Sequence, residues 1–302
     1  MFQQFLKRNI PLFGALLLML SACSSVNTPN AQIGEANPTL NATASDELGT
    51  GLLEITSFDV YSENNRIHLL IAGKTHATGK QQSLRYLFSD DGGHSWMPAR
   101  NPAGNQSGTI ASRGNDVQIA SHGDQRVALW QTQGELPGMG PLVSAYSIDG
   151  GKTWQPGANP AANNAGDQSH ADLIADHAGH FHSVWLEDPE ENGYQSLRHA
   201  ASSNAGQTWN QPKTLDNSTC SCCWNTLTRS SQGQLALLYR DMKPRDMALM
   251  QSDVDGETWN NAGHVGQFGW QFDGCPHTGG AVAYGTSGSR KLHSLAWTGA
   301  KN

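Results

Sequence analysis

Residues 147–154 read Ser-Ile-Asp-Gly-Gly-Lys-Thr-Trp, and variants of this octet stand at residues 89–96, 202–209 and 252–259. The shared pattern is Ser-x-Asp-x-Gly-x-Thr-Trp, and successive copies start 58, 55 and 50 residues apart. A period of about fifty residues is typical of stacked structural repeats, because one unit cannot bury its apolar face alone. The octet suits a tight turn between strands, since Asp accepts bonds from backbone N–H groups further along and Gly adopts positive φ.

The octet resembles the Asp box, or BNR repeat, of sialidases and related β-propellers. The side chains that carry the resemblance are Asp91, Trp96, Asp149, Trp154, Asn204, Trp209 and Trp259. In the fourth copy Val254 replaces the Asp and is flanked by Asp253 and Asp255, so its turn bonding must be rearranged. In that family the box is a structural turn away from the catalytic face. The resemblance therefore implies a fold and says little about chemistry.

Four short strands recur in each repeat, with turn signals between them, and this pattern is typical of a propeller blade. We expect each box to enter a fourth strand at its Trp. The predicted fold is an all-β, sialidase-like β-propeller of four-stranded antiparallel blades, with four full blades and an incomplete fifth. The full blades are expected at residues 52–105, 106–163, 164–217 and 218–264, and the fifth starts near residue 270.

The N-terminal segment is typical of a targeting signal. Lys7 and Arg8 precede a short apolar run, and Leu20-Ser21-Ala22-Cys23 resembles a bacterial lipobox. The resemblance implies a signal peptide over residues 1–22 and lipidation of Cys23. Residues 23–51 are poor in large apolar side chains and are predicted to be a disordered tether, which leaves residues 52–302 for the propeller. These features predict a lipid-anchored protein of the cell envelope, at the outer membrane.

Charge argues against a nucleic-acid partner. The formal net charge is −7, charged residues make up 15% of the chain, and no basic run follows the signal segment. A nucleic-acid-binding domain needs a positive surface to neutralise phosphates. The predicted partners are instead a membrane, through the lipidated N-terminus, and a glycan or glycoconjugate.

The loops that lead into the first strands of blades three, four and five carry thiols and imidazoles. Placed at equivalent positions by the repeat, these residues are His170, Cys220, Cys222, Cys223, Cys275 and His277. Two interpretations remain open. Four cysteines besides Cys23 suggest disulfides in an oxidising compartment, whereas thiolates with imidazoles would suit copper or zinc.

A second dense stretch links two strands of blade four. It contains Arg240, Asp241, Arg245 and Asp246, and Trp224 is expected near the same loops. Interleaved Arg and Asp form either a structural ion-pair network or a site for an anionic ligand. In the second case the two arginines would bind the ligand, and Trp224 would supply a surface on which a sugar can stack.

Sialidases use a Tyr nucleophile assisted by a Glu, an Asp acid/base and three Arg that bind the substrate carboxylate. The Arg triad and the Tyr/Glu pair cannot be assigned in this chain, so its catalytic residues are unknown and enzymatic activity is an open question. The primary functional prediction is glycan recognition at the cell envelope, with sialoside hydrolysis as a secondary form of it. The alternatives are a periplasmic copper- or zinc-binding module and a purely structural or interaction propeller.

Overall fold

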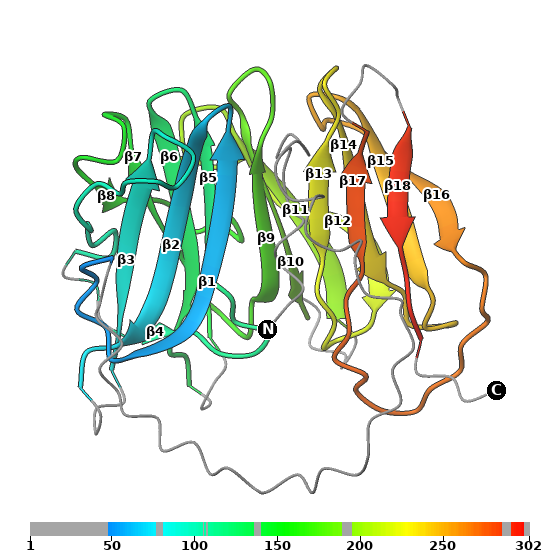
Figure 1. The fold of residues 1–302 in the computed structure, drawn as a ribbon. Coiled ribbons are helices and arrows are strands. Elements are labelled where there is room, and N and C mark those ends of the chain that lie inside the picture. Colours follow the sequence, from blue (N-terminus) through cyan, green and yellow to red (C-terminus); the bar gives the residue numbers. More distant parts are fainter. Residues whose placement is uncertain are drawn as a thin grey trace, which may run out of the picture.

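The computed structural model describes residues 48–76, 81–104, 106, 108–135, 140–188, 195–285 and 291–298. These residues form antiparallel sheets that stand side by side (Figure 1). The predicted signal peptide, Cys23 and most of the predicted tether lie outside the described residues. Within the described ranges, no helix has the length and apolar character needed to cross a membrane.

Five sheets follow one another along the described chain, and their strands pair mostly with their sequence neighbours. Blade one contains β1 (Glu54–Glu63), β2 (Arg66–Lys74) and β3 (Gln82–Ser89). Blade two contains β4 (Thr109–Ile110), β5 (Gln118–His122), β6 (Gln125–Thr132), β7 (Leu142–Ser147) and β8 (Gln155–Pro156). Blade three contains β9 (Ser169–Ala175), β10 (Phe181–Glu187), β11 (Gln195–Ser202) and β12 (Lys213–Thr219). Blade four contains β13 (Thr226–Arg229), β14 (Gln234–Arg240), β15 (Met247–Val254) and β16 (Trp259–Val265), and β17 (Ala281–Tyr284) and β18 (Leu292–Leu295) form the fifth sheet.

This architecture confirms the predicted propeller with an incomplete fifth blade, but the fourth strands differ from expectation. Only β16 starts at the Trp of its box. In the first two boxes a proline, Pro98 or Pro156, follows the Trp by two residues. Proline has no N–H to donate to a strand ladder. As a result β8 ends at Pro156, and the fourth strand of blade one is reduced to a bridge between Tyr86 and Arg100.

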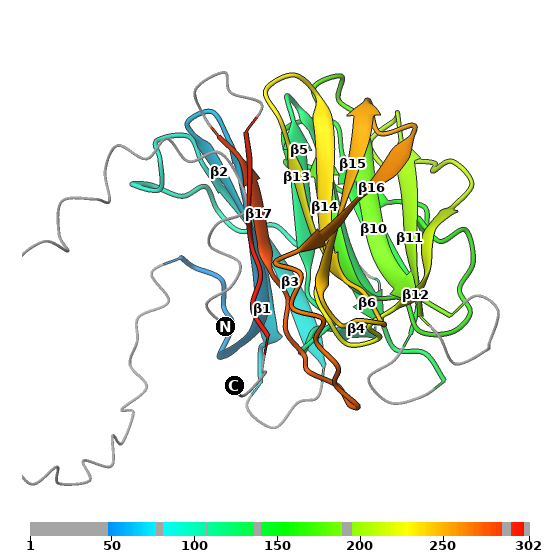
Figure 2. The same cartoon turned by 90° about the vertical axis from the view of Figure 1, so that its right-hand side faces the viewer.

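The first strands of the sheets pack against one another in chain order. β1 contacts β5, β5 contacts β9, β9 contacts β13, and β13 contacts β17. Buried aspartates join neighbouring blades: Asp59 on β1 accepts the N–H of Ile119 on β5 at 2.9 Å, and Asp172 on β9 accepts that of Leu227 on β13 at 2.7 Å. These charge-assisted bonds satisfy the carboxylates and fix the spacing between blades. The chain thus runs around an axis until β17 lies on the same side of the molecule as β1 (Figures 1 and 2).

The core lies between the sheets and repeats from blade to blade. The second strands of blades two, three and four each carry a buried aromatic side chain near their C-terminal ends. These are Trp130 on β6, Trp185 on β10 and Tyr239 on β14, and each is at most 1% exposed. Truncating a buried aromatic side chain to Ala costs about 3–5 kcal/mol of stability. Each of these aromatic side chains therefore contributes substantially to the packing of its own blade.

The Asp boxes form self-contained turns, and the second box shows how. Asp149 accepts hydrogen bonds from the N–H groups of Lys152 and Thr153 at 3.0 Å and from the Thr153 hydroxyl at 2.6 Å. The Ser147 hydroxyl accepts the N–H of Gly151, whose φ of 87° favours glycine. These bonds, mainly that from the Thr153 hydroxyl, lower the pKa of Asp149 to about 2. Each turn is therefore stabilised mainly by its own residues.

The fourth box confirms the predicted rearrangement. Asp253, one position before Val254, accepts the N–H groups of Glu257 and Thr258 at 3.1 Å and the Thr258 hydroxyl at 2.6 Å. Asp255 adopts a φ of 76°, and this backbone conformation accommodates the extra residue in the turn. The hydrogen-bonding role of the box is thus kept although its register in the sequence shifts by one residue.

Candidate functional site

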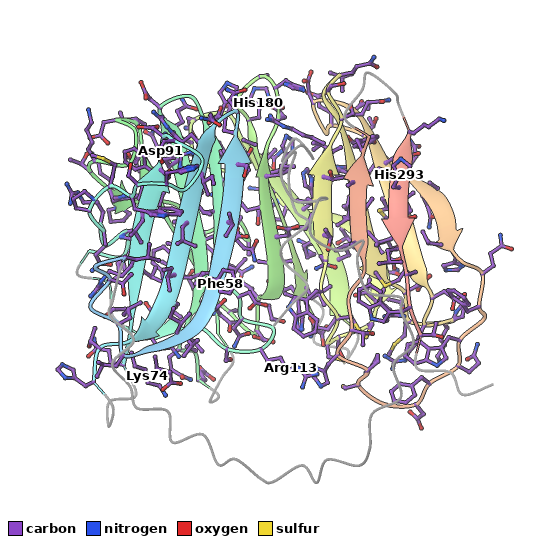
Figure 3. All side chains as sticks on the ribbon, viewed as in Figure 1. Phe58, Lys74, Asp91, Arg113, His180 and His293 are labelled. Carbon is purple, nitrogen blue, oxygen red and sulfur yellow. The ribbon has the colours of Figure 1, made fainter. Side chains whose placement is uncertain are left out.

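The loops that lead into β13 and β17 meet at the end of the propeller opposite the Asp boxes. Figure 3 shows Asp91, from the first box, at one end and Arg113, which precedes β5, at the other. Cys220 donates its backbone N–H to the carbonyl of Arg240 at 3.0 Å, and Thr219 forms a β-bridge to Asp241. These contacts hold the first cysteine loop against the end of β14, which is why its side chains are buried.

Four thiols and one imidazole converge at this end. We call them the thiol cluster: Cys220, Cys222, Cys223, Cys275 and His277. The ligand atoms of the first three cysteines all lie within 4.8 Å of one another, and so do those of Cys222, Cys275 and His277. The first three side chains are buried, whereas Cys275 is exposed and His277 is half-buried.

The structure does not show the predicted disulfide. All four described cysteines are free, and the Cys220 and Cys222 sulfurs are 3.7 Å apart. A disulfide bond is only about 2.05 Å long. The four described cysteines are therefore not paired as disulfides, although their sulfurs lie close together.

His170 lies beside the cluster without joining either set of converging ligand atoms. It is the second residue of β9 and has a φ of 53°, and its ring packs edge-on against Trp224 at 5.6 Å between centroids. Burial lowers the pKa of His170 to about 4, while the neighbouring Cys222 acts in the opposite direction. His277 also has a positive φ, of 49°. Such strained backbone in residues other than glycine gathers at functional sites.

The Arg and Asp residues of the second predicted site lie in the same region and mostly hold its loops together. Arg240 is buried and donates to the carbonyls of Arg245, Trp297 and Thr278 at 2.5, 3.0 and 3.4 Å. Its guanidinium also stacks over Trp270 at 5.1 Å. Through these contacts Arg240 ties the loop after β14 to the segments before β17 and after β18.

The other members of that predicted site are Asp241, Arg245 and Asp246. The side chains of the two aspartates and that of the arginine have different partners. Asp246 accepts the backbone N–H groups of Gly269 and Trp270 at 2.8 and 2.9 Å, and Asp241 bonds to His264 at 2.9 Å. Arg245 instead directs its guanidinium at the thiol cluster and donates to the Cys220 sulfur at 3.3 Å. The thiol cluster and the stretch of interleaved Arg and Asp residues thus meet at Arg245.

Trp224, the predicted sugar platform, is held by its neighbours. Its indole N–H donates to Asp116 at 2.6 Å, and the exposed Arg113 stacks over its ring at 6.0 Å. Arg113 was not among the residues that the sequence predicted for this site. The only sequence signal for Arg113 was its position in the loop before the first strand of blade two.

Electrostatics in the thiol cluster favour one thiolate and oppose more. Hydrogen bonds from the Cys222 and Cys223 thiols, together with the Arg245 charge, lower the pKa of Cys220 to about 3. Hydrogen bonding to Cys220 and burial raise the pKa of Cys223, and hydrogen bonding to Cys222 raises that of Cys275. Further thiolates would repel the first one. A metal cation among the sulfurs would offset that repulsion, and thiol ligands lose their protons when a metal binds.

Comparison with known proteins identifies the repeat. A model of the BNR repeat-like domain matches residues 57–265, well over half of the chain. The chain belongs to the BNR repeat-like family. No curated protein matches this BNR repeat-like chain in sequence.

Solved structures share the fold of this BNR repeat-like domain at low identity. A mutant of NanB sialidase from Streptococcus pneumoniae has a TM-score of 0.54 and 11% identity over 83% of this chain and 57% of its own. The intramolecular trans-sialidase from Ruminococcus gnavus has a TM-score of 0.51 and 11% identity over 73% and 72%. A Hadza microbial sialidase is 18% identical with a TM-score of 0.46, and the chain spans 47% of its length. Identities this low establish the fold alone.

Proposed function

We propose that this BNR repeat-like propeller binds a thiophilic metal ion, copper(I) or zinc(II), through the thiol cluster. One observation carries the proposal: thiols and an imidazole from two separate loops bring their ligand atoms within 4.8 Å of one another. Thiolate and imidazole are ligands that both metals accept. Arg245 adds a positive charge that balances part of the thiolate charge.

The sequence supports a place in the cell envelope for this site. Lipidation at Cys23 and the tether that follows it would hold the propeller at the outer membrane. In an oxidising compartment, neighbouring thiols tend to be converted to disulfides. A bound metal would keep the four thiols reduced, which gives the cluster a physical reason to persist there.

The test uses the full chain, purified in detergent without oxygen. We expect elemental analysis to find copper or zinc, and thiol titration after metal removal to find the cluster cysteines reduced. His277→Gln should weaken metal binding. His264→Gln, an imidazole bonded to Asp241 outside the cluster, is the matched control and should bind as the wild type does. Absence of metal together with oxidised thiols would sink the metal function and make the cysteines structural.

Glycan recognition is a second candidate, favoured by family membership and by a groove on the side of the Asp boxes. A surface hollow of about 670 Å³ lies between blades three and four, a volume typical of small-ligand sites. Its lining combines aromatic and polar side chains that could stack on and hydrogen-bond to a sugar: His180, Trp209, Asn210, Lys213, Asp255 and Glu257.

The two candidates predict different variants. Under the glycan function, Lys213→Ala weakens binding of a sialylated glycan, whereas Cys222→Ser leaves it unchanged. Turnover of a fluorogenic sialoside would add hydrolysis to recognition. If neither metal nor glycan binds, the propeller is a structural or interaction module.

A further inference from the structure

The thiol cluster consists of two triads that share one sulfur. The inner triad is Cys220, Cys222 and Cys223, and the outer triad is Cys222, Cys275 and His277. Three sulfurs that each lie about 2.3 Å from one metal are about 4 Å apart. The 3.7 Å between the Cys220 and Cys222 sulfurs is close to that spacing. The inner triad is therefore close to the arrangement needed to hold an ion of its own, and the outer triad brings its three ligand atoms within 4.8 Å of one another.

We infer that the cluster binds two copper(I) ions, one in each triad, with the Cys222 thiolate bridging them. This inference rests on the proposed metal-binding function and deepens it. Each ion would have three soft donors, three sulfurs inside and two sulfurs with one imidazole outside. Structural zinc instead takes four ligands, and one zinc ion would draw on both triads at once. The number of ions bound thus distinguishes the two metals.

Burial gives the two ions different roles. Cys220 and Cys223 are each 1% exposed, whereas Cys275 is exposed and His277 half-buried. The outer ion therefore exchanges with solution, and the inner ion is shielded from it. Because Cys222 belongs to both triads, an ion can pass inward by exchanging its other ligands while it keeps one sulfur bond. The site would accept copper at the surface and retain it inside.

Loading balances as a ligand exchange without oxidation or reduction. Each protonated thiol loses its proton to the buffer as a copper–sulfur bond forms. Copper stays in the +1 state, and the donor in the solution releases it. Arg245, 3.3 Å from the Cys220 sulfur, holds positive charge beside the inner triad before the first ion arrives.

Stoichiometry tests the inference. The reduced full chain, kept without oxygen, is titrated with copper(I) against a chromogenic chelator. We expect two equivalents for the wild type, one for Cys275→Ser and one for Cys223→Ser. Cys222→Ser should lose both, because the shared sulfur is gone. His264→Gln serves as the control and should keep both equivalents, with circular dichroism used to check that each variant is folded.

The outcomes separate this inference from the function on which it rests. One equivalent in the wild type, lost with any of the four cysteines, would overturn the two-ion site and leave a single metal site standing. Absence of binding would overturn the metal function itself. X-ray absorption of the loaded wild type needs no variant: a copper–copper scattering path supports the bridge, and its absence at two equivalents contradicts it.

Discussion

The two ends of this propeller are built in opposite ways. At the Asp-box end, Asp149 takes its hydrogen bonds from residues within four positions of itself. At the thiol end, Cys220 meets Arg245 from the loop between β14 and β15, and Cys222 meets Cys275 from the loop between β16 and β17. A local turn can be repeated in every blade, whereas a site assembled from several loops forms once. The contrast is consistent with an Asp-box end that maintains the fold, and it supports the proposal that the thiol end binds metal.

The largest expected effect is loss of metal at the thiol end. Cys222→Ser should lower copper(I) affinity by more than about 100-fold, since even residues that only support a metal ligand are worth 10–100-fold. Competition with a copper(I) chelator measures this. If Cys222→Ser kept the wild-type affinity, the contrast between the two ends would fail, because the thiol end would then hold no functional metal.

The next largest effect is a loss of stability in acid, caused by buried imidazoles that lie toward the Asp-box end. Burial lowers the pKa of His68 to about 2, helped by Arg126 and Arg66, and that of His199 to about 3, helped by His182 and Lys213. Unfolded histidine takes up a proton near pH 6.5, and these folded imidazoles do not. The contribution of these imidazoles to the free energy of unfolding should therefore be complete above about pH 6.5. Below that pH it falls, and by about pH 4.5 each imidazole has lost about 2–3 kcal/mol of it.

Urea unfolding at about pH 7 and about pH 4.5 measures this loss. The fall should be smaller in His199→Gln, which removes one of the imidazoles whose pKa is lowered by burial. Carboxylates with lowered pKa values, such as Asp149, keep their contribution above their unfolded pKa of about 3.9 and lose most of it between that pH and their folded pKa of about 2. Equal stability at the two pH values would show that these imidazoles are protonated as easily in the folded state as in the unfolded one.

A smaller effect is expected from one Asp box. Asp149→Ala removes the acceptor for Lys152 and Thr153 and should lower the free energy of unfolding by about 1–2 kcal/mol. Copper(I) affinity should stay at the wild-type value. Glu135→Ala, an exposed carboxylate outside any box, is the matched control. If Asp149→Ala weakened metal binding as much as a cysteine variant does, the two ends would not be independent.

The smallest effect is a gain in the third box. Asn204 accepts the Thr208 N–H at 3.0 Å and uses its amide to donate to the Thr208 hydroxyl at 2.9 Å. Asn204→Asp would let the hydroxyl donate to a carboxylate, as Thr153 does to Asp149, and should add less than about 1 kcal/mol. The midpoint of urea unfolding would rise slightly. A clear fall would mean that the amide is better suited to this turn than the carboxylate of the other boxes.

The sequence could locate much of the candidate site along the chain. It could not tell which of the residues there act together. The repeat placed the cysteine loops and His277 at equivalent positions, and they do meet. The same reasoning left disulfide and metal interpretations open and treated Arg240 and Arg245 as a pair. Only the folded chain separates them: Arg240 binds three backbone carbonyls, and Arg245 binds the Cys220 sulfur.

The sequence by itself determined the propeller, because the Asp boxes and second-strand aromatics specify turns and strands through contacts within one unit. It could also predict that Asp253 and Asp255 must rearrange the fourth box. The tertiary structure alone decided that Cys222 belongs to two triads and that His170 stays outside both. Those relations depend on side-chain directions from loops tens of residues apart, and such directions are fixed only when neighbouring blades pack.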